Sequence, residues 1–299
     1  MKPIRKIAFV GLGNMGVPMA AQLAAKGFAL SLYDRRAEAA RSFAVSHGGR
    51  PTESAADAAS DADAAICMLP DDAAVSDVVL GAGGLLSSLK AGSVIIDMST
   101  SDPRATVKIG GEVAKRGTAY VDAPVMGGVV FAKDATLDVM VGGRNEDIER
   151  CQPIFAALGR QVFRCGPLGS GHALKALANY VNASALVTLI EALAIGRKFG
   201  LDSKVMADAL LHMCAGRQHP LEKKVIPQVL THKFATGMTL GLIAKDVSIA
   251  VNFGHAIGAM TPLAERVCEI WKTAETKIGA KADQTEVARL WEEGNHITL

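Results

Sequence analysis

The sequence predicts an α/β domain with a doubly wound, mostly parallel sheet, followed by an all-α domain. Up to residue 167, short apolar runs alternate with segments of helical periodicity, which is typical of a parallel sheet with helices on both faces. After Gly171 the strand signals stop, and the rest of the chain has helical patterns. A chain of 299 residues is long enough for two domains. We therefore predict domains over residues 1–167 and 168–299, with the boundary near Pro167.

Apolar runs bounded by turn residues mark the strands of the first domain, and 3.6-residue periodicity marks the helices. The predicted strands are 7–10, 29–33, 64–69, 94–97, 120–122, 137–141 and 162–163. A first helix begins at Gly16, and further helices are predicted over 55–61, 71–80, 103–116 and 145–158. In the second domain we predict helices over 173–198, 203–214, 219–231, 238–257, 261–277 and 284–292. Pro220, Gly237, Pro262 and Gly279 lie at or near the breaks between them.

A glycine turn follows the first predicted strand. Its residues are Gly11, Leu12, Gly13, Asn14, Met15 and Gly16, a G-x-G-x-x-G pattern between a strand and a helix. In that context Gly11 permits a tight turn, Gly13 lets the backbone approach a pyrophosphate, and Gly16 allows close packing of helix on strand. The free N–H groups of the helix start then face the phosphates. The turn predicts a dinucleotide cofactor.

The end of the second predicted strand bears on the choice between NAD and NADP. Asp34 follows this strand at the distance expected of an acid that holds the ribose hydroxyls of NAD. Arg35 and Arg36 come next and are able to bind the 2′-phosphate of NADP. Because Asp34 would repel that phosphate, we favour NAD, with NADP as the alternative.

Three further segments fall at the carboxyl ends of predicted strands, where ligands bind in such sheets. They are Leu69-Pro70, Ser99-Thr100 and the loop from Met126 through Gly127 to Gly128. We assign Leu69, Pro70, Ser99 and Thr100 to the cofactor site.

The run from Gly169 to Asn179 opens the second domain. Its helix is apolar nearly all round, which predicts burial on most sides. Burial and the positive end of the helix would both depress the pKa of Lys175 toward the range useful for proton transfer. The alternative is a lysine whose stem packs on apolar surface while its ammonium reaches water. Asn179 lies one helical turn later and projects from the same face.

The composition excludes several function classes. With a net charge of +2, 5% aromatic residues and no basic patch, nucleic acid is a poor candidate ligand. The five cysteines form no C-x-x-C pair and the seven histidines no H-E-x-x-H pattern, so we expect a reducing compartment, no disulfide frame and no metal. The first apolar run is too short for a signal peptide, and residues 173–195 carry polar and charged side chains. We expect a cytoplasmic protein with no membrane span and a small-molecule substrate.

Five motifs occur in the order typical of one enzyme family. They are Gly11-Leu-Gly-Asn-Met-Gly16, Asp97-Met-Ser-Thr100, Asp122-Ala-Pro-Val-x-Gly-Gly128, Gly171-x-x-x-Lys175-x-x-x-Asn179 and Lys245-Asp246. Over nearly its whole length the chain therefore resembles the β-hydroxyacid dehydrogenase family, which includes 3-hydroxyisobutyrate dehydrogenases and tartronate semialdehyde reductases. The resemblance implies a Rossmann domain, a long interdomain helix, an all-helical C-terminal domain and a homodimer or homotetramer.

The same resemblance implies roles for individual residues. Lys175 is expected to be the general acid/base, and Asn179 to orient the same substrate oxygen. Lys245 and Asp246 are expected near the nicotinamide and the substrate, and Phe234 is expected to line the pocket. The implied reaction is hydride transfer between NAD(P) and a small 3-hydroxy acid or its semialdehyde.

Met126 departs from the family pattern, because the usual residue is a serine that helps to hold the substrate carboxylate. A thioether is a weak hydrogen-bond partner. Anion binding would then depend on the backbone N–H groups of Gly127 and Gly128, with Ser99. The apolar Val129, Val130 and Phe131 follow, which favours a substrate with an alkyl group, unless these residues are simply packing.

Two alternatives remain open from the sequence. One is a reductase of the sulfolactaldehyde type or of another short-chain semialdehyde, since the serine is also replaced there. The other, from a different class, is a catalytically silent NAD(P)-binding regulatory protein. The presence of Lys175 argues against the silent protein.

Overall fold

The computed structural model describes residues 3–216, 219–256 and 258–299, without the side chains of residues 180, 215, 216, 246, 249, 250 and 253. The chain divides into two compact units, Met1–Tyr180 and Val181–Leu299, and each is described by itself. Helix α8 (Ser170–Phe199) runs through the point of division.

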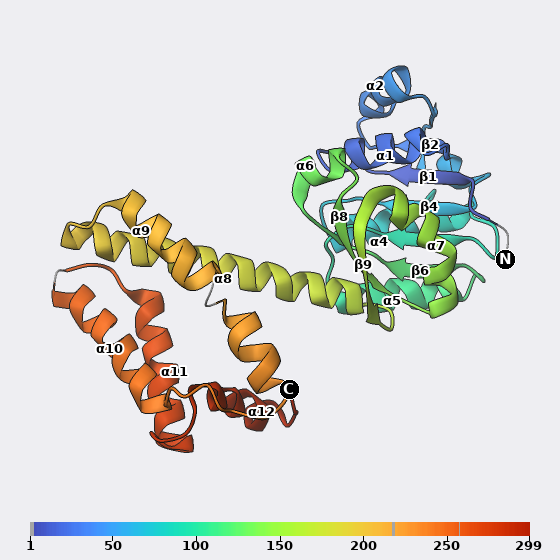
Figure 1. Cartoon of the computed structure of the whole chain (residues 1–299). Helices are drawn as coiled ribbons and strands as arrows, with labels where there is room; N and C mark the ends of the chain where they lie inside the picture. Colours follow the sequence, from blue (N-terminus) through green and yellow to red (C-terminus); the bar gives the residue numbers. More distant parts are fainter. Residues whose placement is uncertain (1–2, 217–218, 257) are drawn as a thin grey trace. The chain divides into compact units, whose positions relative to one another are not determined.

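One sheet forms the centre of the first unit (Figure 1, blue to green). In the described part of the chain its nine strands run in the order β3-β2-β1-β4-β5-β6-β8-β7, with β9 also paired to β8. β8 is antiparallel to β6 and β7, and the other pairs are parallel. The strands are β1 (Lys6–Val10), β2 (Ala29–Tyr33), β3 (Arg50–Pro51), β4 (Ala64–Cys67), β5 (Val94–Asp97), β6 (Ala119–Asp122), β7 (Val125–Met126), β8 (Leu137–Gly142) and β9 (Gly159–Gly166).

Helices cover both faces of this sheet, as the alternating pattern predicts. Side chains alternate along each strand: Ile7 and Phe9 face one apolar cluster, whereas Ala8 and Val10 face the other. The first cluster is covered by α1 (Gly16–Ala25), α2 (Ala37–His47) and α7 (Asn145–Leu158). The second is covered by α3 (Ala55–Ala59), α4 (Asp72–Leu80) and α5 (Pro103–Ala114). The structure therefore confirms a doubly wound, mostly parallel sheet.

Several elements of the first unit were not predicted. They are α2, β3, β7, the 3-10 segment η1 (Leu85–Ser87) and α6 (Gly128–Lys133). α2 has only Ala40 and Phe43 buried, so its apolar periodicity is weak. α6 follows a segment predicted as a loop, because the two glycines at its start concealed the helix that begins at Gly128.

The second unit is helical, but three predicted helices differ from the structure. Residues 203–214 form α9 (Ser203–Leu210) and then a π-helical segment, η2 (Leu211–Gly216). Residues 219–231 contain a π-helical segment, η3 (Leu221–Val229), in which Pro227 lacks the N–H that an α-helix needs there. Residues 284–292 split into a 3-10 segment, η4 (Gln284–Ala288), and α12 (Arg289–Asn295). Periodicity in the sequence does not distinguish these helix types.

The two remaining helices of this unit agree with prediction within a few residues. They are α10 (Leu240–Ala256) and α11 (Pro262–Ile278). The predicted end of the first of them, residue 257, lies outside the described residues.

The prediction that α8 is buried on most sides is wrong for the single chain. Its exposed apolar residues include Leu177, Val181, Leu186, Val187 and Ile190. By length and composition α8 also meets the criteria for a membrane-crossing helix among the described residues, and none of its most apolar window is buried. An apolar sequence predicts that a surface is covered, but it does not say by what.

Candidate active site

The carboxyl ends of five parallel strands meet at one edge of the sheet. The neighbouring order β2-β1-β4-β5-β6 brings the segments after these strands side by side. Backbone hydrogen bonds continue past the strand ends: the N–H of Met68 donates to the Val10 carbonyl oxygen at 2.9 Å, and that of Met98 to Cys67 at 2.9 Å. The glycine turn, Leu69, Ser99 and Met126 therefore follow strands that end at a common edge.

The glycine turn has the shape that a dinucleotide requires. Gly11 has a φ of +99°, and a Cβ there would overlap the carbonyl oxygen of Met68. A Cβ at Gly16 would overlap the carbonyl oxygen of Gly11, so the start of α1 packs closely on the turn. At Gly13, by contrast, no heavy atom lies within 4 Å of an added Cβ. The open side of the turn thus leaves room for a pyrophosphate, and the residues present fit the cofactor.

Asp34 lies beside this turn. Its Oδ2 accepts from the N–H of Leu12 at 2.8 Å, and its Oδ1 accepts from the N–H of Arg36 at 2.9 Å and from Nε at 3.1 Å. Burial tends to raise the pKa of Asp34, but the hydrogen bonds from Arg36 and Leu12 more than offset it, and the pKa is lowered. Both arginines are exposed, and Arg36 is the one that pairs with Asp34.

Ser99 joins two of the loops at this edge. Its Oγ accepts from the N–H of Leu69 at 3.0 Å, and its own N–H donates to Oδ1 of Asp97 at 3.0 Å. Ser99 is fully buried, whereas Pro70 and Thr100 are exposed. The Ser99 hydroxyl thus braces the loops after β4 and β5 in this structure.

Lys175 and Met126 are brought together, although they are far apart in the sequence. Lys175 lies in the second turn of α8 with only 8% of its surface exposed, and its Nζ is 3.5 Å from Sδ of Met126. Burial lowers the pKa of Lys175, as predicted. Asn179, one turn further along α8, is exposed. Lys175 and Asn179 therefore lie one helical turn apart, but only Lys175 is buried.

The two glycines after Met126 adopt conformations that favour glycine. Gly127 has a φ of +131° and precedes α6, and Gly128, the first residue of α6, has a φ of +72°. Val129, Val130 and Phe131 are 38%, 67% and 43% exposed, so these apolar residues do not belong to the core of the unit.

The remaining predicted site residues belong to the second unit. Phe234 is half-buried, has a φ of +46°, and packs edge-to-face on His232 with 5.2 Å between ring centroids. The Arg289 guanidinium carbon lies 5.3 Å from the centroid of the same ring. Lys245 is exposed on α10. The side chain of Asp246 lies outside the described residues.

A buried polar cluster around His172 was not predicted as part of the site. The His172 ring is fully buried, with Nδ1 2.7 Å from Oγ1 of Thr106 and Nε2 3.1 Å from the carbonyl oxygen of Ser99. The carboxylate of Asp122 accepts from the backbone N–H groups of Gly169 at 2.7 Å and His172 at 2.8 Å. The sequence carried two signals for this cluster. Asp97 and Asp122 each end an apolar strand, and His172 directly follows the run Gly169-Ser-Gly171.

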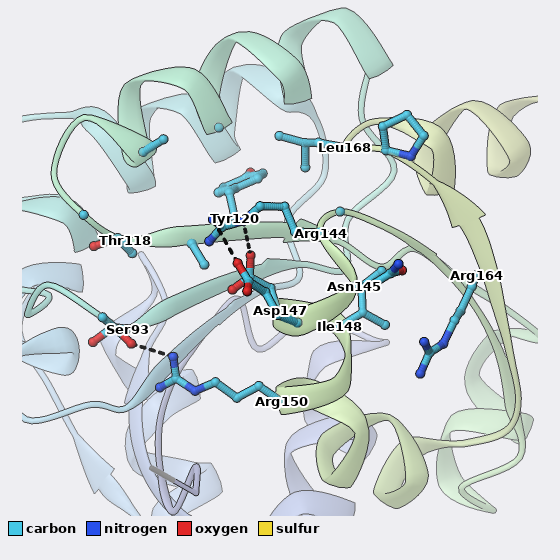
Figure 2. A pocket seen from close by; sticks show the side chains of 18 of the residues that line it. Ser93, Thr118, Tyr120, Arg144, Asn145, Asp147, Ile148, Arg150, Arg164 and Leu168 are labelled. Atoms are coloured by element: carbon cyan, nitrogen blue, oxygen red, sulfur yellow. Dashed lines mark hydrogen bonds and ion pairs between the residues drawn. The ribbon is translucent and has the colours of Figure 1, made fainter. Parts of the chain in front are cut away.

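A cleft of about 1140 Å³ lies elsewhere, at the amino ends of β5 and β6 (Figure 2). It is lined by residues that include Ser93, Thr118 and Arg150, and Arg144 there pairs with Asp147 at 2.8 Å. It contains none of the residues predicted for cofactor, substrate or proton transfer. Cavity size therefore does not locate the chemistry in this unit.

Comparison with known proteins identifies the family. A model described as the NAD binding domain of 6-phosphogluconate dehydrogenase matches residues 6–166. A second, described as NAD-binding of NADP-dependent 3-hydroxyisobutyrate dehydrogenase, matches residues 169–291. The chain is 33% identical to 2-(hydroxymethyl)glutarate dehydrogenase of Eubacterium barkeri over 98% of this chain and 97% of that protein. This chain belongs to the β-hydroxyacid dehydrogenase family. It is accordingly an NAD(P)-dependent hydroxyacid dehydrogenase.

Other members of the β-hydroxyacid dehydrogenase family show the same full-length similarity. NAD-dependent L-serine dehydrogenase of Pseudomonas aeruginosa is 32% identical, over 97% of this chain and 98% of that protein. The structure of 3-hydroxyisobutyrate dehydrogenase of Mycobacterium tuberculosis with L-serine has a TM-score of 0.67 and 29% identity, over 96% of this chain and 99% of that one.

Proposed function

We propose that this β-hydroxyacid dehydrogenase acts on a small 3-hydroxy acid of the form HOCH₂–CH(R)–COO⁻, or on its semialdehyde, with 3-hydroxyisobutyrate-like acids favoured. The observation that carries the proposal is a buried lysine, Lys175, beside Met126 at the edge of the sheet where the glycine turn lies. The similar proteins are named for 2-(hydroxymethyl)glutarate, L-serine and 3-hydroxyisobutyrate. All three compounds share this HOCH₂–CH(R)–COO⁻ unit and differ only in R.

Lys175 is the proposed proton donor and acceptor. When bound, NAD(P) supplies or accepts the hydride. The Lys175 ammonium donates a proton to the carbonyl oxygen in reduction, and the neutral amine takes the hydroxyl proton in oxidation. Its contact in this structure, the Met126 sulfur, is a weak acceptor, so a substrate oxygen can replace it at little expense. Burial favours the role because it lowers the pKa of Lys175 toward the working range.

The proposed preference for an alkyl R group rests on Met126. Its thioether lies 3.5 Å from Nζ of Lys175, so it lies close to any group that the lysine protonates. A hydroxyl or ammonium substituent would gain no strong hydrogen bond from it, whereas a methyl group would make favourable apolar contact. We expect M126S to improve kcat/KM for glycerate relative to 3-hydroxyisobutyrate by about tenfold.

The proposed cofactor is NAD in preference to NADP. Asp34 is held in its ionised form beside the glycine turn. A 2′-phosphate placed there would be repelled, unless Arg36 left Asp34 to pair with it. Replacing Asp34 with Ser should therefore reduce the preference for NAD, as measured by the ratio of kcat/KM with the two cofactors.

The proposed function is tested by following nicotinamide absorbance with both cofactors and a panel of 3-hydroxy acids and semialdehydes. We expect turnover of 3-hydroxyisobutyrate to exceed that of glycerate. Lys175→Ala should bind the cofactor normally and lose about a thousandfold or more in kcat. A loss of less than about tenfold, roughly 1.4 kcal/mol, would exclude Lys175 as the proton donor.

We also propose that the enzyme is a cytoplasmic homodimer or homotetramer in which a second copy covers the exposed apolar side of α8. Leu186 and Ile190, one turn apart on that helix, are 59% and 57% exposed. Contiguous apolar surface of this kind marks interaction sites in soluble proteins. Because the chain is similar to dehydrogenases over its full length, we propose another protein subunit, and not a membrane, as the partner that covers this surface.

A further inference from the structure

The start of α8 is held by a carboxylate from another element. The first N–H groups of a helix have no partner within the helix, and here Asp122, at the end of β6, accepts two of them. Its Oδ1 is 2.7 Å from the N of Gly169, and its Oδ2 is 2.8 Å from the N of His172. A negative group at this position also complements the helix dipole.

Glycines allow this close approach. A Cβ at Gly171 would lie 2.8 Å from Oδ2 of Asp122 and overlap the carbonyl oxygen of Met140. A Cβ at Gly142, on β8, would lie 2.5 Å from Oδ1 of Asp122. The first turn of α8 is therefore fixed against β6 and β8 without room for adjustment.

The His172 ring connects this turn to two further elements. A carbonyl oxygen only accepts, so Nε2 of His172 carries the proton that it shares with the carbonyl oxygen of Ser99 at 3.1 Å. Nδ1 lies 2.7 Å from Oγ1 of Thr106 on α5. The ring also lies close to two buried carboxylates, with 4.0 Å from Nε2 to Oδ2 of Asp97 and 3.9 Å from Nδ1 to Oδ2 of Asp122.

These contacts act on the lysine through the helix. Residues three apart are neighbours on one face of an α-helix, so fixing His172 fixes the position of Lys175. We propose that His172 and Asp122 are positioning residues that hold Lys175 at a fixed position relative to the Ser99 loop and Met126. Ser99 in turn braces Leu69 through its hydroxyl, so one set of hydrogen bonds joins α8 to the loops after β4 and β5. The inference rests on the proposed role of Lys175 in proton transfer.

The kinetic test compares His172→Leu with His172→Gln. Leucine fills a similar volume but leaves the Ser99 carbonyl without its His172 donor, and the Thr106 hydroxyl keeps only the Asp102 carbonyl oxygen, 3.1 Å away, as a partner. The glutamine amide can still donate to the Ser99 carbonyl. Because a displacement of about 1 Å is enough to slow a positioned reaction about a hundredfold, we expect H172L to lose about that factor in kcat. KM should change less than about threefold, and H172Q should recover most of the loss.

Asp122→Asn gives an independent measurement at the other end of the cluster. The amide has the size of the carboxylate, but its NH₂ group cannot accept from a helix N–H. We therefore expect kcat to fall with little change in KM, in the same direction as in H172L. The matched control is Ser93→Ala, a buried serine before β5 whose Oγ is 3.4 Å from the carbonyl oxygen of Ala62. S93A should keep wild-type kinetics even if its Tm falls.

A second readout does not require turnover. The rate at which acetic anhydride labels Lys175, followed against pH by mass spectrometry, reports the burial and the pKa of this amine. In H172L we expect a higher limiting rate at high pH, because the neutral amine is more accessible, and a pKa closer to that of an exposed lysine, with no such change in S93A. If the wild-type enzyme reduced or oxidised none of the panel compounds, the proposed function would fail while this measurement still tested the positioning role. Wild-type labelling and kcat in folded H172L would overturn the inference, as would an equal loss of kcat in H172L and H172Q.

Discussion

The two halves of α8 share one apolar composition but differ in what surrounds them. In the first turns, Gly171, His172 and Lys175 are buried. Asp122 at the end of β6 accepts from the backbone there, and the His172 ring contacts the loop after β5 and helix α5. From Leu177 onward most of the large apolar side chains are exposed. Glu191 is one polar anchor there, because its carboxylate accepts from the N–H groups of Leu263 at 3.0 Å and Ala264 at 2.9 Å. Lys175, the proposed proton-transfer residue, therefore lies where the helix is fixed by hydrogen bonds to the first unit, whereas the rest of the helix has exposed apolar surface.

The sharpest test of this contrast is one substitution made in each half. Gly171→Ala would bring a Cβ against the backbone oxygen of Met140 and the Asp122 carboxylate, which cannot move freely. We expect it to destabilise the fold by about 3 kcal/mol and to abolish most activity. Gly196→Ala meets chiefly the flexible end of Met206 and should be tolerated within about 1 kcal/mol. Urea denaturation and steady-state kinetics of both variants measure the difference; equal effects would contradict it.

The exposed half of α8 should control assembly. We expect the double variant Leu186→Lys/Ile190→Lys to be monomeric, because two charges on the apolar face oppose its burial against another subunit. Light scattering coupled to gel filtration gives the mass. Val45→Lys, at a 90% exposed position on α2, is the matched control and should leave the mass unchanged. A monomeric wild-type protein would refute the proposed oligomer.

The first half of α8, which contains Lys175, should determine the pH dependence of catalysis. Burial lowers the pKa of Lys175, so the folded value lies below the ordinary value of about 10.4. With Lys175 as the proposed proton donor, reduction needs the protonated lysine, so kcat/KM should fall about tenfold per pH unit once the pH exceeds this pKa. Oxidation needs the neutral amine, so kcat/KM for oxidation should rise with pH and level off above the same pKa. Profiles that lack both limbs in the wild type, or retain them in Lys175→Ala, would be inconsistent with the assignment.

The smallest expected effect concerns Glu191. Glu191→Gln removes the charge from a group that accepts from two N–H groups at the start of α11. Loss of such a cap costs about 1 kcal/mol, so we expect a Tm lowered by a few degrees. Because Glu191 belongs to the other half of α8, kcat should stay within about twofold of wild type. A large loss of kcat at unchanged KM would show that the two halves are coupled more strongly than the structure indicates.

Much of the fold followed from patterns that depend on local physics. Strands β2 and β5 have the predicted bounds, since uninterrupted apolar runs between turn residues leave little choice. The π-helical turn around Pro227 and the split after Ala288 were missed, because the choice among helix types depends on which carbonyl each N–H reaches. α2 was missed because the solvent-facing side of a helix carries little periodic signal.

The sheet, its glycine turn and the helix that carries Lys175 were predictable from the amino-acid sequence, because strand, turn and helix patterns are read over neighbouring residues. No sequence pattern predicted that Met126 lies 3.5 Å from Lys175, or that the His172 ring at the start of α8 contacts Ser99 and Thr106. The structure also shows that the most apolar part of α8 is exposed in the single chain. The physical reason is that hydrogen bonds and burial link residues dozens of positions apart, and their partners are set by how elements pack and not by any local preference.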